Sequence, residues 1–210
     1  MTKYKITIKS IAVRAISIWA ICSFSLYGSA WAQASTYENE RADAVRFGLQ
    51  PGNAKPEVLA QLPAANFSGK GLLRFLGFDV YNASLWVTPP FKYSELGQHA
   101  VALELEYLRK FRRQEIARVS LEQMRLSGGF SAEQGQQWQT ALANTLPDVK
   151  PGDRLLGVYK PGASVLFALN GQVIGEITDA QFAKLFFDIW LGPKSSSPKL
   201  REQLLAGAPR

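Results

Sequence analysis

Four side chains on apolar, strand-like runs of this sequence have the chemistry to hold an anion. A half-buried arginine keeps its charge and therefore needs an anion or several acceptors close by. A tyrosine adds an apolar ring and one hydroxyl. Together these groups suit a carboxylate or a phenolate at the mouth of an apolar cavity. The candidate ligand-binding residues are Arg74, Tyr81, Tyr107 and Arg109.

An internal ion pair is the alternative explanation for each arginine. Arg74, for example, could pair with Asp79 and need no ligand. The backbone decides whether Arg74 and Tyr81 can act together. In an unbroken strand over residues 72–86 the two side chains point to opposite faces, whereas a β-bulge at Gly77 would bring them to one face.

Most other catalytic chemistry is missing from the sequence. The single histidine, His99, stands next to Gln98 in an expected loop, and no Gly-x-Ser-x-Gly motif supplies a serine nucleophile for a triad. The glycines at 69 and 71 form only a fragment of a phosphate-binding loop. With one histidine and one cysteine a transition-metal site is not expected. We therefore predict no metal and no cofactor.

The first 32 residues are typical of a secretory signal peptide. Four basic residues precede an apolar run at residues 16–27, and small residues flank Trp31 where a signal peptidase would read them. A short membrane anchor is the alternative, but the run is shorter than the roughly 20 residues that a spanning helix needs. We expect cleavage after Ala32, export to the periplasm, and no membrane span in the mature chain.

Cleavage changes the chemistry of the mature protein. It removes four basic residues, so the net charge falls from +7 to about +3. It also removes Cys22, the only cysteine, which leaves neither a disulfide nor a thiol nucleophile. The remaining basic residues are scattered apart from a cluster at residues 109–113, so nucleic acid is not an expected partner.

The periodicity of the mature chain predicts an α+β domain over residues 65–206, preceded by a lead-in or linker over residues 33–64. Residues 101–111 alternate, which indicates a half-buried antiparallel strand with a solvated outer face. Helical spacing follows, with expected capping boxes at Ser131 and Thr178. We predict helices over 112–127, from 131, from 178 to 192 and from 197, and strands over 154–159, 164–169 and 172–177, the last two joined by Asn170-Gly171.

The run GKGLLRFLGFDVYNASLWV at residues 69–87 resembles the strand signature of bacterial chalcone isomerase-like proteins. Further matches follow in the same order, and the most specific is FFDIWLG at residues 186–192. The resemblance covers roughly residues 65–206 and implies a chalcone isomerase-like open β-sandwich, with a large antiparallel sheet covered on one face by helices. The other matches are Tyr107-Leu108-Arg109, Trp138, Pro151-Gly152-Asp153 and Asn170-Gly171.

The resemblance implies two different functions, catalysis or ligand binding. Plant chalcone isomerases cyclise a chalcone with an arginine, a threonine, a tyrosine and an asparagine, and related plant proteins bind fatty acids. Here the threonine position, counted back from Tyr81, is Leu76, and Ala64 and Ala65 stand where the arginine is expected. The tyrosine and asparagine have no counterpart in residues 112–121. Without such donors the stabilisation of an oxyanion is lost, at about 3 kcal/mol for each.

Three functions follow from these observations. The first is an exported, non-catalytic binder of a small apolar acid, such as a fatty acid, in a cleft between sheet and helices. The second is an isomerase or intramolecular lyase acting on another enone or phenolic substrate, with a tyrosine as proton donor. The third is an interaction protein whose core is filled, which predicts no cavity between sheet and helices.

Overall fold

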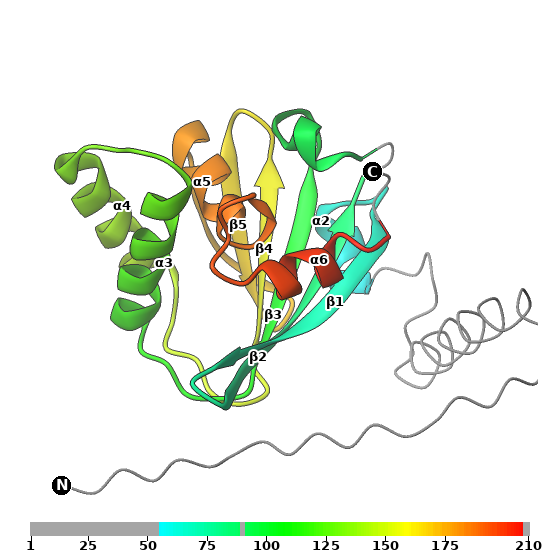
Figure 1. Ribbon diagram of the computed structural model, residues 1–210, viewed down its shortest axis with the longest axis horizontal. Helices are drawn as coiled ribbons and strands as arrows, with labels where there is room; N and C mark the ends of the chain where they lie inside the picture. Colours follow the sequence, from blue (N-terminus) through cyan, green and yellow to red (C-terminus); the bar gives the residue numbers. More distant parts are fainter. Residues whose placement is uncertain (1–54, 89–90, 208–210) are drawn as a thin grey trace, which may run out of the picture. The chain divides into compact units, whose positions relative to one another are not determined.

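The structure is a computed structural model that describes residues 55–88 and 91–207. The predicted signal peptide and most of the predicted lead-in lie outside these residues. Six strands within them form one antiparallel sheet in which each strand pairs with its neighbour in sequence (Figure 1). The strands are β1 (Asn66–Phe75), β2 (Phe78–Val87), β3 (Val101–Tyr107), β4 (Arg154–Lys160), β5 (Ser164–Leu169) and β6 (Gln172–Ile177).

Most of the helices cover one face of this sheet, which confirms the predicted α+β architecture. The main core lies between the sheet and the helices α3 to α6, and Figure 1 shows α5 and α6 in front of the strands. None of the helices in the described parts of the chain has the length and apolar character of a membrane span. The helical elements are α2 (Pro56–Gln61), η1 (Tyr93–Gln98), α3 (Arg113–Ser127), α4 (Ala132–Thr145), α5 (Ala180–Leu191) and α6 (Pro198–Leu204).

Residues 66–87 form a β-hairpin, so the unbroken strand considered over residues 72–86 is wrong. β1 and β2 meet at a two-residue turn whose central residues both have positive φ, 51° at Leu76 and 82° at Gly77. Positive φ at both positions is typical of a type I′ turn. Gly77 therefore makes the turn and not a bulge. The turn escapes sequence reasoning because Leu76 replaces the asparagine or aspartate that usually signals it.

The Leu76 backbone provides a first prediction. A leucine at positive φ is strained, whereas asparagine adopts this conformation readily and is preferred before glycine in type I′ turns. Because Leu76 is 81 % exposed, its side chain adds little to the core. Leu76→Asn is expected to stabilise the domain by about 1 kcal/mol, measured by urea unfolding. Leu76→Ala, which keeps the strain, should give a smaller gain; equal stability for both variants would contradict the turn assignment.

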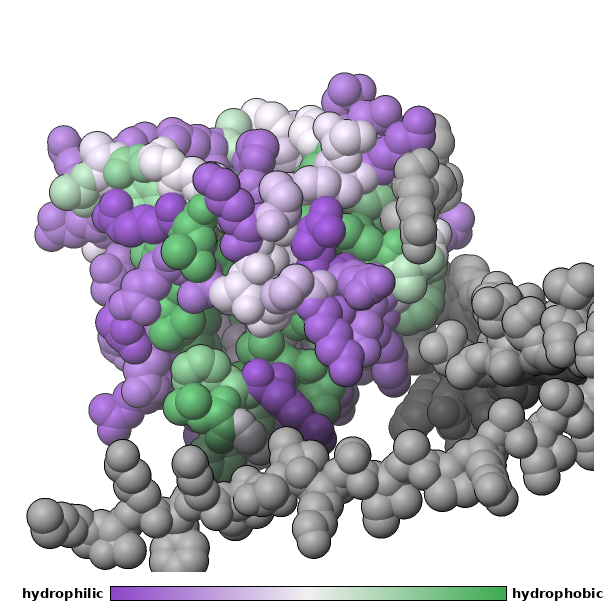
Figure 2. Space-filling view, viewed as in Figure 1, coloured by the Kyte–Doolittle hydropathy of each residue, from purple (hydrophilic) through white to green (hydrophobic). Residues whose placement is uncertain are grey.

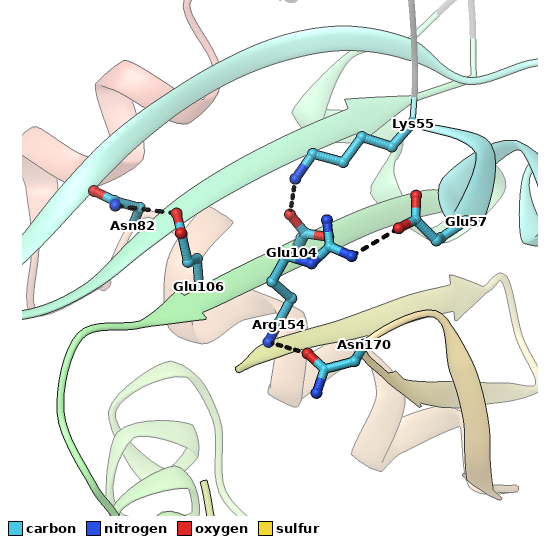
Figure 3. Close-up of polar contacts among 7 residues, drawn as sticks. All are labelled: Lys55, Glu57, Asn82, Glu104, Glu106, Arg154 and Asn170. Atoms are coloured by element: carbon cyan, nitrogen blue, oxygen red, sulfur yellow. Dashed lines mark hydrogen bonds and ion pairs between the residues drawn. The ribbon is translucent and has the colours of Figure 1, made fainter. Parts of the chain in front are cut away.

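The outer face of the sheet is less solvated than the alternation of β3 suggested. Helix α2 packs on this face and forms a second apolar cluster with Trp86, Ala102 and Leu156. Glu104, predicted to be in water, is only 5 % exposed. Its carboxylate pairs with Lys55 just before α2, and Glu57 of α2 pairs with Arg154 at 2.8 Å (Figure 3). The cover comes from a segment about 50 residues away in sequence, which a local pattern does not reveal.

Of the two capping boxes predicted from the sequence, the one at Ser131 is present and the one at Thr178 is not. Ser131 and Gln134 form the predicted capping box, with both hydrogen bonds at 3.0 Å. Helix α5 is capped by Asp179 and not by Thr178, because the Asp179 carboxylate accepts from the backbone N–H of Phe182 at 2.9 Å. The same carboxylate also accepts from the indole of Trp138, which ties α4 to α5.

Candidate functional site

Tyr81 and Tyr107 lie directly opposite each other on β2 and β3, on the helix-covered side of the sheet. Their rings pack edge to face with centroids 5.9 Å apart. Tyr107 is buried and Tyr81 is half-buried. Since residues in register on antiparallel strands share a face, the alternation along both strands is what brings the two tyrosines together.

Helix α5 completes this aromatic seam. The indole N–H of Trp190 donates to the Tyr81 hydroxyl at 2.8 Å, and the Trp190 ring packs on Phe186. On the other side the Tyr107 ring contacts Phe111, with centroids 5.8 Å apart. In the sequence Trp190 stood out only as part of the FFDIWLG match at residues 186–192. An indole needs a hydrogen-bond partner when it is buried, and that need was the available signal.

The two hydroxyls of the seam retain hydrogen-bonding capacity. The Tyr81 oxygen accepts from Trp190, so its own proton is still available for donation. The Tyr107 hydroxyl makes no hydrogen bond within residues 55–88 and 91–207. Burial raises the pKa of both tyrosines well above its ordinary value, most strongly through desolvation. Both groups therefore stay protonated at physiological pH, and each can donate one O–H hydrogen bond.

The two candidate arginines lie outside this donor pair. Arg74 is exposed, and its guanidinium donates to Asp79 at 2.5 Å, so the ion pair considered as its alternative is present. Arg109 is exposed beyond the end of β3, with its guanidinium 4.6 Å from the Phe78 ring centroid. No hydrogen bond or ring contact in the described part of the chain joins either arginine to the tyrosines. The structure brings together half of the predicted set.

An open hollow of about 680 Å³ lies next to the seam, where β3 ends and α3 begins. Phe111 contributes to its wall and contacts Tyr107, so the hollow and the tyrosines share one aromatic side chain. The hollow carries both signs of charge, from the basic Lys110, Arg112 and Lys150 and the acidic Glu115, Asp148 and Asp153. Asp153 has a structural role, because its carboxylate accepts hydrogen bonds from the Lys150 backbone and from Asn170. These hydrogen bonds lower the pKa of its carboxyl.

The described residues contain no group of three or more histidine, cysteine, aspartate or glutamate side chains arranged to hold a metal ion. His99 lies 3.4 Å from Glu95 and packs against the Phe91 ring, in the loop region between β2 and β3. Its contacts are those of a structural side chain. The chemistry available at the seam is therefore hydrogen-bond donation in an apolar setting.

A meander sheet, helices packed on its face and an aromatic seam between them define an α+β domain. Residues 61–206 match the sequence profile of the chalcone isomerase-like family, which is well over half of the chain. The chain belongs to this family. The resemblance seen in the glycine pair, the Val-Tyr strand and the aromatic helix is thereby confirmed.

Two known proteins are similar to this chain. An uncharacterized protein of Haemophilus influenzae is 35 % identical over 85 residues, and this stretch spans only 40 % of each sequence. A crystal structure of a fatty-acid binding protein of Arabidopsis thaliana matches the fold with a TM-score of 0.55. That match covers 74 % of this chain and 90 % of the plant protein at 14 % identity, so it supports the fold alone.

Proposed function

We propose that this protein is a non-catalytic binder of a small apolar acid of the fatty-acid type, held between the sheet and α5. The observation that carries the proposal is the donor pair of Tyr81 and Tyr107, which has no acceptor among the described residues. A carboxylate accepts two such hydrogen bonds at once. A hydrogen bond to a charged group contributes roughly 1.5–3 kcal/mol, so two such bonds would favour a bound carboxylate.

The surroundings of the donor pair support an apolar ligand with one charged end. Phe111 and Trp190 border the tyrosines with apolar surface, and the exposed cations Arg109, Lys110 and Arg112 follow β3 directly. Exposed cations in the segment that follows Tyr107 would attract an anion and raise its rate of association. A protein that shares this fold is a fatty-acid binding protein, which agrees with the same ligand class.

Binding is a better reading of these residues than catalysis. The position that corresponds to the threonine of plant chalcone isomerases is Leu76, an apolar residue in an exposed turn. The raised pKa of both tyrosines suits a stable donor and not a group that exchanges protons near neutral pH. With its signal-like N-terminus, we propose that the protein acts after export, in the periplasm.

Replacing the tyrosine hydroxyls tests the proposal. Tyr81→Phe and Tyr107→Phe are each expected to weaken fatty-acid binding by about tenfold, and the double variant by about a hundredfold, since each removes a hydrogen bond to a charged group. The measurement is isothermal titration of the full chain with saturated fatty acids and phenolic acids. Native mass spectrometry of the protein from its own envelope fraction would identify the natural ligand.

Stability of the ligand-free protein distinguishes this role from a structural one. Tyr107→Phe removes a hydroxyl that has no partner in the described chain, so it should leave the free energy of unfolding unchanged or raise it by up to about 1 kcal/mol. Tyr159→Phe, another buried tyrosine on the same sheet face, is the control and should not change ligand affinity. If the protein binds none of the ligands and Tyr107→Phe destabilises it, the result would support an interaction protein whose core is filled.

A further inference from the structure

Three large apolar side chains stand in water at the tip of the β1–β2 hairpin. Phe75, Leu76 and Phe78 are 65 %, 81 % and 57 % exposed. Figure 2 shows hydrophobic residues gathered at the lower end of this face of the domain, where Figure 1 places the hairpin. Single exposed apolar residues are ordinary, but a cluster of this size on adjacent positions indicates an interaction surface.

The turn itself is built at a cost to the fold. Leu76 has φ of 51°, a region that non-glycine residues rarely occupy. An asparagine at this position would relieve the strain and remove an exposed apolar side chain at once. Strained residues are concentrated at functional surfaces, where another constraint favours them. Here we infer that Leu76 is retained because its exposed side chain contacts a binding partner.

Positive charge lies beside this tip. The backbone N–H of Leu108 donates to Val80 at 2.9 Å, which holds the segment after β3 against the hairpin. Arg109 in that segment lies over the ring of Phe78. Among the described residues, Arg109, Lys110 and Arg112 form no ion pair, whereas the next residue, Arg113, pairs with Asp148 at 3.5 Å.

We propose that this hairpin tip docks on the surface of a lipid bilayer that contains anionic lipids. Phe75, Leu76 and Phe78 enter the interface between headgroups and acyl chains, while the neighbouring cations meet the lipid phosphates. An exposed turn that carries three apolar side chains is too small for a stable protein interface, which buries about 800 Å² on each partner. A bilayer needs no complementary shape, so a small apolar tip flanked by cations is sufficient.

This inference is independent of ligand binding at Tyr81 and Tyr107, although the same hairpin carries both features. A domain that docks on lipid by this tip would hold the seam close to the membrane. Docking can therefore succeed while ligand binding fails, or the reverse, and the two experiments separate them.

Vesicle binding of the full chain tests the docking surface. The double variant Phe75→Ser/Phe78→Ser is expected to lower the partition coefficient onto phosphatidylethanolamine–phosphatidylglycerol vesicles by at least about tenfold. Leu76→Asn should lower it as well while raising the stability of the fold. Leu126→Ser, which changes an exposed apolar residue near the C-terminal end of α3, is the matched control and should bind like the unmodified chain.

Two further readouts locate the contact. Lys110→Gln/Arg112→Gln should weaken binding to phosphatidylglycerol vesicles and leave binding to neutral phosphatidylcholine unchanged. Amide hydrogen exchange over residues 74–79 should slow when vesicles are added, while exchange over residues 122–127 at the end of α3 should not. All variants keep the N-terminal segment, so its own contribution to lipid binding is the same throughout.

Other outcomes overturn the proposal. Equal vesicle binding by the double variant and the control, with unchanged exchange at residues 74–79, would show that the tip does not touch lipid. Failure of the unmodified chain to bind vesicles would do the same. A lipid-independent dimer that protects residues 74–79, and that Phe75→Ser/Phe78→Ser dissociates, would assign the tip to contact with a second copy of the chain.

Discussion

Lys55→Met is expected to destabilise the domain by about 3 kcal/mol, because it leaves the Glu104 carboxylate buried without its cation. Glu104 lies in the middle of the sheet, between β2 and β4, within the apolar cluster beneath α2. Its side chain is 6 % exposed, while that of Lys55 is 32 % exposed. Removing the lysine leaves the more buried of the two charges unpaired, so the loss of stability is expected to be large.

A double-mutant cycle separates the pair from its surroundings. Lys55→Met/Glu104→Met should recover most of the lost stability, since a buried ion pair is often replaceable by apolar residues. Lys160→Met is the matched control, because its partner Glu176 lies at the surface of the sheet and the expected loss is below about 1 kcal/mol. Urea unfolding gives the free energies of the unmodified chain, of Lys55→Met, Glu104→Met and the double variant, and of the control. If Lys55→Met costs no more than the control, the Lys55–Glu104 pair does not contribute to stability.

Gly69→Ala is expected to cost about 3 kcal/mol, because α6 lies directly on β1 at this glycine. A Cβ at position 69 would lie 2.1 Å from the carbonyl oxygen of Gln203 and 2.7 Å from that of Leu204. Both are backbone atoms, so no side chain can rotate away. The helix would have to move off the strand.

Such a displacement would break further contacts. The Ser68 hydroxyl donates to the Leu204 carbonyl at 2.9 Å, and the Gly207 N–H donates to the Ser68 carbonyl at 2.7 Å. Leu204 is fully buried and would lose part of its packing. Thermal unfolding of Gly69→Ala is the measurement, with Gly97→Ala as the control, since a Cβ at position 97 meets nothing within 4 Å. Equal unfolding temperatures would mean that α6 does not rest on β1.

The close approach of α6 gives a physical reason for the glycines in the family signature. A Cβ at Gly71 would meet the Gln203 side chain at 2.4 Å, so both glycines of β1 face the last helix. From sequence alone these glycines resembled a fragment of a phosphate-binding loop. Their role in the fold is to let one backbone lie against another.

Part of the candidate site followed from local pattern. The alternation of β3 placed Tyr107 on the buried side, and the Val-Tyr pattern of β2 supplied Tyr81; the sheet register joins them. Their role as ligand-binding residues stays a prediction until binding is measured. For Arg74 the sequence left two roles open, ligand binding or an ion pair with Asp79. The turn at Leu76 lacks the usual asparagine or aspartate, so the hairpin that brings Arg74 to Asp79 was not predicted.

The sequence by itself determined the features that depend on near neighbours. The alternation of strands, the Asn170-Gly171 turn, the Ser131 cap and the α+β order all arise from residues a few positions apart. Only the tertiary structure decided that Trp190 bonds to Tyr81 across 109 positions and that Lys55 neutralises Glu104. Backbone preferences act within a turn or a strand, whereas burial and hydrogen bonding between distant segments depend on how the whole chain packs.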